Sequence, residues 1–129
     1  MKKILVKTHN KKYPIIIGSQ ILKNFSKILL KNSINSKNCL FIIDNKIPNK
    51  FLNIFKKIKN RKIYFHKFKS SEKNKNYKSL NNILNILQEK NFHRNDCVIA
   101  VGGGIVGDVS SFAASIFKRG LYFVNIPTT

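Results

Sequence analysis

The sequence is 129 residues long and 43% hydrophobic, enough for one domain with a core of its own. No apolar run approaches the ~18 residues that cross a bilayer, and the apolar part of the opening residues is too short for a signal peptide, so we expect a cytoplasmic protein without membrane contact. The net charge of +20 is typical of nucleic-acid binding, but all basic residues except Arg61, Arg94 and Arg119 are lysines spread along the chain, which lack the bidentate chemistry of nucleic-acid readers.

Strands and helices alternate along the chain. We predict strands at residues 3–8, 14–18, 39–44, 62–67, 97–101 and 121–126 and helices at 20–31, 48–59, 79–91 and 105–118. Asn10-Lys11-Lys12 lies between the first two strands, which predicts a hairpin. The later strands are separated by helices, which predicts an α/β, Rossmann-like domain: a mostly parallel sheet with flanking helices and an N-terminal β-hairpin. Continuous apolar runs at 40–43 and 98–101 predict the two central strands.

The cysteines and histidines do not form a metal-binding pattern. Cys39 and Cys97 each begin an apolar strand with no second Cys or His at ligand spacing, so we predict reduced core thiols, with a disulfide between neighbouring strands as the alternative. His9 is expected in the hairpin turn, His66 in a strand and His93 after a helix. We therefore expect no metal site in these residues.

A glycine-rich turn follows the strand at 97–101. Three successive glycines allow positive φ and a close approach to a ligand, so that the amides of the next helix point at an anion. Gly102, Gly104 and Gly107 match the dinucleotide fingerprint, but no acidic residue follows Asp108 to hold a ribose. The pattern favours a cofactor-phosphate site whose ribose ligand lies earlier in the chain. The alternative is a turn that only packs a helix on the sheet.

Several polar residues follow the carboxyl ends of predicted strands, where ligands bind in open parallel sheets. Asp44 offers acceptors for ribose hydroxyls, or it merely forms a turn. Glu72 and Lys75 lie in a polar stretch that composition alone predicts to be a solvated loop. Thr128 and Thr129 follow the last strand. All of these residues are expected to share one edge of the sheet.

The helix at 105–118, which follows the glycine-rich turn, is predicted from apolar residues at spacings of three and four. Phe112 and Ile116 belong to its expected buried face. Asp108 is expected in its first turn, where the helix dipole alone explains an acidic residue. Arg119 stands just after this helix, in a chain that otherwise uses lysine, which suggests a need for a guanidinium fork. The alternative is a surface arginine that interacts with the helix C-terminus.

Residues 101–129, VGGGIVGDVSSFAASIFKRGLYFVNIPTT, resemble the glycine-rich segment of the 3-dehydroquinate synthases, the NAD-using enzymes of the shikimate pathway. Ser71-Glu72-x-x-Lys75 is similar to the family's GExxK element and stands at the family's distance before the glycines, with Ser71 where the family usually has glycine. Ser111 likewise stands where the family often has glycine. Residues 13–22 resemble the family's opening hairpin, so the match covers essentially the whole chain.

The resemblance implies that residues 1–129 are an NAD-binding N-terminal domain. It implies cofactor contacts from Asp44, Ser71, Glu72, Lys75, Gly103, Gly104, Ile105, Val106, Gly107, Asp108, Thr128 and Thr129. It also implies that Arg119 reaches a substrate phosphate across a homodimer interface. The family's helical second domain, with a Glu and two His that bind a divalent Zn or Co ion, is expected to lie beyond Thr129.

The implied activity is the second step of the shikimate pathway to chorismate and the aromatic amino acids. DAHP (3-deoxy-D-arabino-heptulosonate 7-phosphate) is converted to 3-dehydroquinate with elimination of phosphate, and NAD is used and regenerated. A chain without the metal ligands is not expected to turn over alone. Two alternatives stay open: the same nucleotide domain in a related sugar-phosphate cyclase or metal-dependent polyol dehydrogenase, and a non-catalytic basic binding module.

Overall fold

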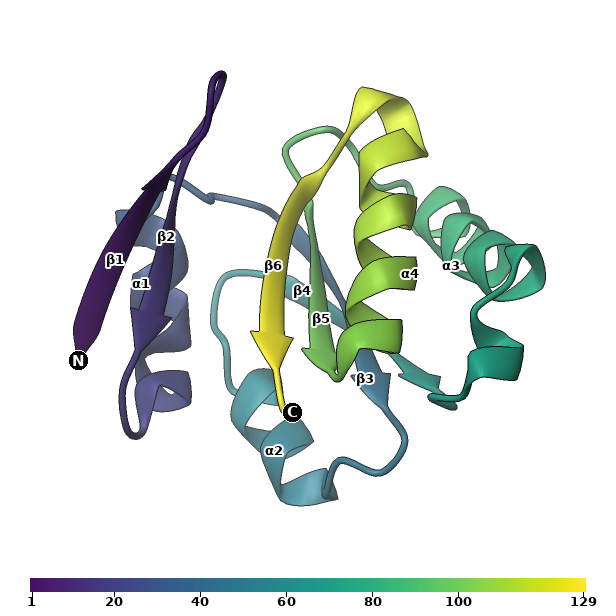
Figure 1. Ribbon diagram of the computed structural model, residues 1–129, viewed down its shortest axis with the longest axis horizontal. Coiled ribbons are helices and arrows are strands. Elements are labelled where there is room, and N and C mark those ends of the chain that lie inside the picture. Colours follow the sequence, from purple (N-terminus) through teal and green to yellow (C-terminus); the bar gives the residue numbers. More distant parts are fainter.

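The computed structural model describes residues 1–129 and contains a two-stranded and a four-stranded sheet (Figure 1). The strands are β1 (Lys2–Lys7), β2 (Lys12–Ile17), β3 (Asn38–Asp44), β4 (Lys62–Phe68), β5 (Cys97–Gly102) and β6 (Tyr122–Pro127). The helices are α1 (Phe25–Lys31), α2 (Asn49–Lys56), α3 (Tyr77–Glu89) and α4 (Gly104–Ile116), with short 3-10 turns η1 (Ile21–Asn24), η2 (Glu72–Asn74) and η3 (Phe117–Arg119). Every predicted element is present with shifted ends, and no helix combines the length and apolar character that a membrane crossing needs.

The four-stranded sheet has the order β4-β3-β5-β6, and all of its pairings are parallel. The predicted α/β class and the central position of β3 and β5 are therefore confirmed. Both central strands are buried along nearly their whole length. Because all four strands run the same way, their carboxyl ends form one edge of the sheet and their amino ends form the opposite edge.

Helices cover both faces of this sheet (Figure 1). Successive strand residues point to opposite faces, so Leu40 and Ile42 pack with α3 and α4, whereas Phe41 and Ile43 pack with α1 and α2. On the second face Phe41 stacks on Phe55 of α2, with ring centroids 4.4 Å apart. Each fully buried side chain of this size contributes about 1.5–3 kcal/mol. These two cores fix the sheet, and the sheet fixes the edges described below.

The two cysteines face each other inside the second core. Cys39 on β3 is the register partner of Cys97 on β5, and both are free and fully buried, as predicted. Burial raises the pKa of the Cys39 thiol, and it raises the pKa of the Cys97 thiol well above its ordinary value. Both thiols are thus kept protonated and act as small apolar groups in the core.

A hydrogen-bonded network closes the amino edge of the sheet. The buried Asp96 carboxylate accepts hydrogen bonds from the Asn38 amide (3.0 Å) and the His93 amide (2.8 Å). The Arg61 guanidinium donates to the carbonyls of Ser36 (3.0 Å) and Ile34 (2.8 Å). These bonds satisfy buried polar groups and tie the loops before β3, β4 and β5 together.

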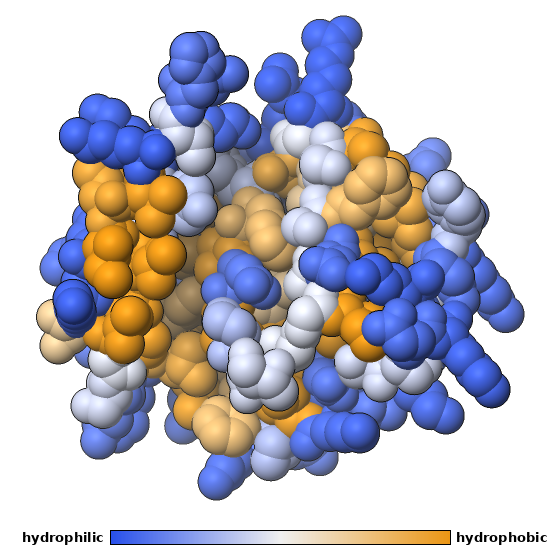
Figure 2. Space-filling model, in the orientation of Figure 1, coloured by the Kyte–Doolittle hydropathy of each residue, from blue (hydrophilic) through white to orange (hydrophobic).

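The predicted hairpin, β1 and β2, forms a separate antiparallel sheet. Its apolar side chains remain substantially exposed, among them Leu5 and Ile17, and Figure 2 shows them as an apolar patch at the left of the view. None of its residues belongs to either core. The hairpin therefore does not help to position the edges of the parallel sheet.

Candidate functional site

The carboxyl edge of the parallel sheet brings together the residues that the sequence predicted for it. Asp44 ends β3, and the glycine turn follows β5 directly. A Cβ atom added to Gly102 would lie 3.2 Å from Asp44 Cβ, and one added to Gly103 would lie 3.0 Å from Thr129 Oγ1. The Thr128 amide donates to the Gly102 carbonyl at 3.0 Å. Asp44 and the threonine pair thus flank the turn on either side.

The glycine turn has a different conformation from the one expected. β5 runs through Gly102, Gly103 is extended (φ −82°, ψ −166°), and α4 begins at Gly104, so no glycine of the turn has a positive φ. The strand leads into the helix without a left-handed residue. Gly102 is required instead by packing, because its Cβ would lie 2.9 Å from Val106 Cγ2, and a Cβ on Gly107 would lie 3.2 Å from Asn125 Oδ1.

Gly104 differs from its neighbours because a Cβ there would meet nothing within 4 Å. It is the first residue of α4, and no side chain caps that end of the helix. The amides of residues 104–106 therefore have no partner within the helix and carry the positive end of its dipole. Val106 is fully buried and Ile105 is half-buried, so Val106 has only its backbone to offer to the opening. Backbone donors beside open space suit an anion such as a phosphate.

The carboxylate of Asp108 pairs with a lysine that is distant in sequence. Lys75 Nζ lies 2.9 Å from Asp108 Oδ2, and this is the one ion pair of the chain. The hydrogen bond to Asp108 and its negative charge raise the pKa of Lys75. Asp108 lies beyond the first turn of α4, so the expectation that the helix dipole explains it is wrong. The pair joins the loop after β4 to α4, which brings two predicted cofactor residues into contact.

A shallow pocket of about 490 Å³ lies beside this ion pair. Its lining includes Lys75 and Asp108 together with Tyr77, Leu80 and Phe112. Tyr77 is 80% exposed and Phe112 is 50% exposed, so both offer aromatic surface to a flat ring. The sequence interpretation missed Tyr77 and assigned Phe112 to the buried face of the helix. The helix period identifies a face but not how far a neighbouring helix covers it, and Ile116 on the same face is also half-exposed.

The remaining predicted residues of this edge differ in whether their side chains already make hydrogen bonds within the chain. Asp44 Oδ1 accepts a hydrogen bond from the Lys46 amide at 3.0 Å, so the turn-forming role is real, while its second oxygen has no partner within the chain. Ser71 precedes η2 in an extended conformation and its side chain makes no capping bond. Glu72 begins η2 and is exposed. Asp44 and Glu72 thus retain free acceptors in the segments that follow β3 and β4.

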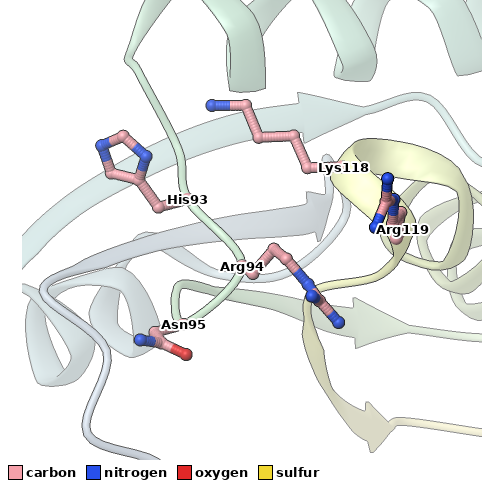
Figure 3. A pocket seen from close by; sticks show the side chains of 5 residues that line it. All are labelled: His93, Arg94, Asn95, Lys118 and Arg119. Carbon is pink, nitrogen blue, oxygen red and sulfur yellow. The ribbon is translucent and has the colours of Figure 1, made fainter.

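Arg119 lies at the opposite edge of the sheet, because it precedes β6 whereas the glycine turn follows β5. It lines a pocket of about 540 Å³ with His93, Arg94, Asn95 and Lys118 (Figure 3). Lys118 (φ 45°) and Arg119 (φ 67°) both have left-handed backbone conformations. Such residues cost about 1–3 kcal/mol each and cluster at binding sites. Within one chain the structure does not bring Arg119 to the glycine turn.

No three His, Cys, Asp or Glu side chains of the chain lie close enough together to hold a metal ion. His66 is on β4, where partial burial lowers its pKa, and His9 lies in the turn between β1 and β2. His93 follows α3 and lines the pocket of Arg119. The residues present therefore do not fit a divalent metal.

A parallel sheet with a glycine turn and an uncapped helix at its carboxyl edge is typical of nucleotide-binding α/β domains. A family model described as "3-dehydroquinate synthase N-terminal" matches residues 65–129, and the chain belongs to this family. The chain is 53% identical to the 3-dehydroquinate synthase of Pelagibacter ubique (strain HTCC1062) over 128 residues, which are 98% of this chain and 35% of that protein. It is 42% identical to the 3-dehydroquinate synthase of Prochlorococcus marinus (strain MIT 9312), and the match covers 99% of this chain and 36% of that protein.

Solved structures share the fold. A 2-deoxy-scyllo-inosose synthase complexed with carbaglucose-6-phosphate, NAD+ and Co2+ matches 99% of this chain and 35% of its own, with a TM-score of 0.86 and 20% identity. A 2-epi-5-epi-valiolone synthase from Streptomyces hygroscopicus subsp. jinggangensis 5008, with NAD+ and Zn2+ bound, matches 96% of this chain and 34% of its own, with a TM-score of 0.74 and 21% identity. The chain spans about a third of the length of the proteins it matches.

Proposed function

We propose that residues 1–129 are the NAD-binding part of a 3-dehydroquinate synthase, which converts DAHP to 3-dehydroquinate with elimination of phosphate. The names of the family and of its members at 53% and 42% identity support this activity. The observation that carries the proposal is the opening at Gly104, where uncapped helix amides meet space that no side chain fills. A dinucleotide pyrophosphate has the charge and the shape for that opening.

Each residue of the carboxyl edge has a role in this proposal. The amides of residues 104–106 hold the pyrophosphate, Gly104 leaves the space for it open, and Gly103 and Gly107 contact it through their backbone. The free oxygen of Asp44 accepts from ribose hydroxyls, and Thr128 and Thr129 donate to the cofactor from the other side of the turn.

The adenosine end of NAD is proposed to lie at the pocket beside η2. Ser71, Glu72 and Lys75 offer it hydrogen bonds, and Asp108 keeps Lys75 in place through their ion pair. The exposed rings of Tyr77 and Phe112 offer stacking surfaces for the adenine. When bound, NAD supplies the hydride acceptor, and these residues only bind and orient it.

The remaining chemistry is proposed to belong to the part of the relatives that this chain does not cover. That part would supply the ligands of a divalent metal and most contacts to the substrate. Arg119 is proposed to reach the substrate phosphate of a second protomer, since it lies at the opposite edge of the sheet from its own glycine turn. Buried free thiols agree with a reducing, cytoplasmic location.

The test is the substitution Gly104→Val with NAD affinity measured by isothermal titration calorimetry. The Cβ of the new side chain enters space with no protein atom within 4 Å, so we expect a folded variant with at least about a hundredfold weaker NAD binding, or ~2.7 kcal/mol. Ser115→Val places the same side chain on the exposed far end of α4 and is the matched control. A folded Gly104→Val protein with wild-type affinity would contradict the proposal.

A further inference from the structure

The three arginines of the chain are used in two different ways. Arg61 is fully engaged in the fold, since its guanidinium donates to the carbonyls of Ser36 and Ile34. Arg94 and Arg119 make no ion pair, and both line one pocket at the amino edge of the sheet. All other basic residues are lysines. The chain thus gathers its two unengaged guanidinium groups at a single place.

No carboxylate lines this pocket. Asp96 lies next in sequence, but it is buried, and its oxygens accept from the Asn38 and His93 amides. In Figure 3 Arg94 extends from the loop before β5 to the side on which Arg119 lies, while Lys118 extends toward the His93 side. With two guanidinium groups and no acid in its lining, the pocket carries an unbalanced positive charge that favours an anion.

Specific bonds fix the two segments that carry these arginines. Lys118 Nζ donates to the Phe92 carbonyl at 2.7 Å, and the Tyr122 amide donates to the Asp96 carbonyl at 3.1 Å. These bonds tie the Arg119 turn to the Arg94 loop. Lys118 and Arg119 both have left-handed backbone conformations, and both line the pocket. Because the two segments are held before a ligand arrives, only the two arginine side chains have to be ordered, which lowers the entropic cost of binding.

We propose that Arg94 and Arg119 together form a two-guanidinium site for a phosphoryl group, with Arg94 as a phosphate ligand beyond the one the proposed function assigns. Each guanidinium presents a planar fork that matches two phosphate oxygens, and two of them neutralise the dianion. The inference rests on the proposed function only for the source of the phosphoryl group, which is either a sugar phosphate monoester or free phosphate. The site itself follows from the geometry of the pocket.

The experiment titrates the 129-residue protein separately with inorganic phosphate and with glucose 6-phosphate. The arginine Nε–Hε region of its NMR spectrum holds one signal from each arginine, and Arg61 is the internal reference. We expect the signals of Arg94 and Arg119 to shift on one common saturation curve while that of Arg61 stays. Arg94→Ala should weaken phosphate binding at least about tenfold, whereas Lys27→Ala, which removes one exposed charge from α1, should change it less than about twofold.

Three results would overturn the proposal: an Arg94 signal that does not move, equal effects of Arg94→Ala and Lys27→Ala, or shifts of all three arginines alike. Saturation by glucose 6-phosphate alone would assign the site to the monoester, and equal saturation by both would assign it to the phosphoryl dianion; either supports the proposal. NAD affinity is measured in parallel and should be the same in Arg94→Ala and wild type. A wild-type protein that binds phosphate but does not bind NAD would refute only the proposed function.

Discussion

The two edges of the parallel sheet present their hydrogen-bond donors in opposite ways. At the carboxyl edge the donors are backbone amides at the start of α4, and three of the five acidic residues, Asp44, Glu72 and Asp108, lie in the segments of this edge. At the amino edge the donors are the guanidinium groups of Arg94 and Arg119, and no carboxylate lines their pocket. Acidic residues beside amides suit a ligand with both hydroxyls and phosphates, whereas bare arginines suit a phosphate alone.

The difference between the two edges shows that the net charge of +20 does not by itself indicate the function. Most of it comes from lysines distributed over the surface, and Figure 2 shows hydrophilic side chains on all sides of the visible face. What distinguishes the edges is the placement of a few acids and two arginines. The comparisons with known proteins do not favour a basic module without catalysis, the alternative that the charge suggested.

The largest effect is expected where the carboxyl edge depends on close packing. A Cβ on Gly102 would lie 2.9 Å from Val106 Cγ2, so Gly102→Val should destabilise the fold by about 1–3 kcal/mol through overpacking. Gly104→Ala, whose Cβ enters open space, should leave stability unchanged or raise it by up to about 1 kcal/mol. Urea unfolding midpoints measure both. Equal destabilisation by the two substitutions would mean that the glycines do not have the separate roles assigned to them.

The second effect tests whether the edges act separately. Asp44→Ala removes an acceptor proposed for the ribose, so it should weaken NAD binding by about 1–3 kcal/mol. Arg119→Lys lies at the other edge and should leave NAD affinity of this chain unchanged. Calorimetric titration of both variants decides the matter. If Arg119→Lys weakened NAD binding as much as Asp44→Ala did, the separation of the two edges would be wrong.

The sequence predicted most of the fold because each element leaves a local signal. The apolar runs at 40–43 and 98–101 are continuous since helices cover both faces of β3 and β5. The carboxyl edge was also predictable, because parallel strands necessarily bring Asp44, the glycine turn and Thr128 to one side. Local pattern and topology were sufficient for these features.

The contacts between distant segments were not predictable. Asp108 pairs with Lys75, 33 residues earlier, because α4 packs beside the loop after β4, and no periodicity encodes that packing. Arg94 and Arg119 line one pocket because the amino ends of β5 and β6 lie side by side. The predicted positive φ of the glycines was wrong for the same reason. Glycine is needed at position 102 because a Cβ there would crowd Val106 and Asp44, not because the turn itself requires it.

The smallest effect concerns the Lys75–Asp108 ion pair, which belongs to the carboxyl edge and has no counterpart at the other. Both side chains are exposed, so Asp108→Asn should hardly change the unfolding midpoint. The pair should instead order the loop that carries Lys75. We expect Asp108→Asn to lower the backbone order parameters of Asn74 and Lys75 in NMR relaxation, whereas Glu89→Gln, which removes an exposed and unpaired acid from α3, should not.

The ordering of the loop by the Lys75–Asp108 pair should depend on ionic strength but not on pH near neutrality. Asp108 raises the pKa of Lys75, so the pair's contribution is complete below the ordinary lysine value and is lost only as the pH rises through the raised pKa in the folded protein. Between pH 6 and pH 8 the order parameters should therefore stay constant. Raising the ionic strength from ~0.01 M to ~1 M shortens the Debye length from about 30 Å to about 3 Å and should shrink the difference between wild type and Asp108→Asn. A difference that persists unchanged at high salt would indicate that the Asp108 side chain orders the loop by packing rather than by charge.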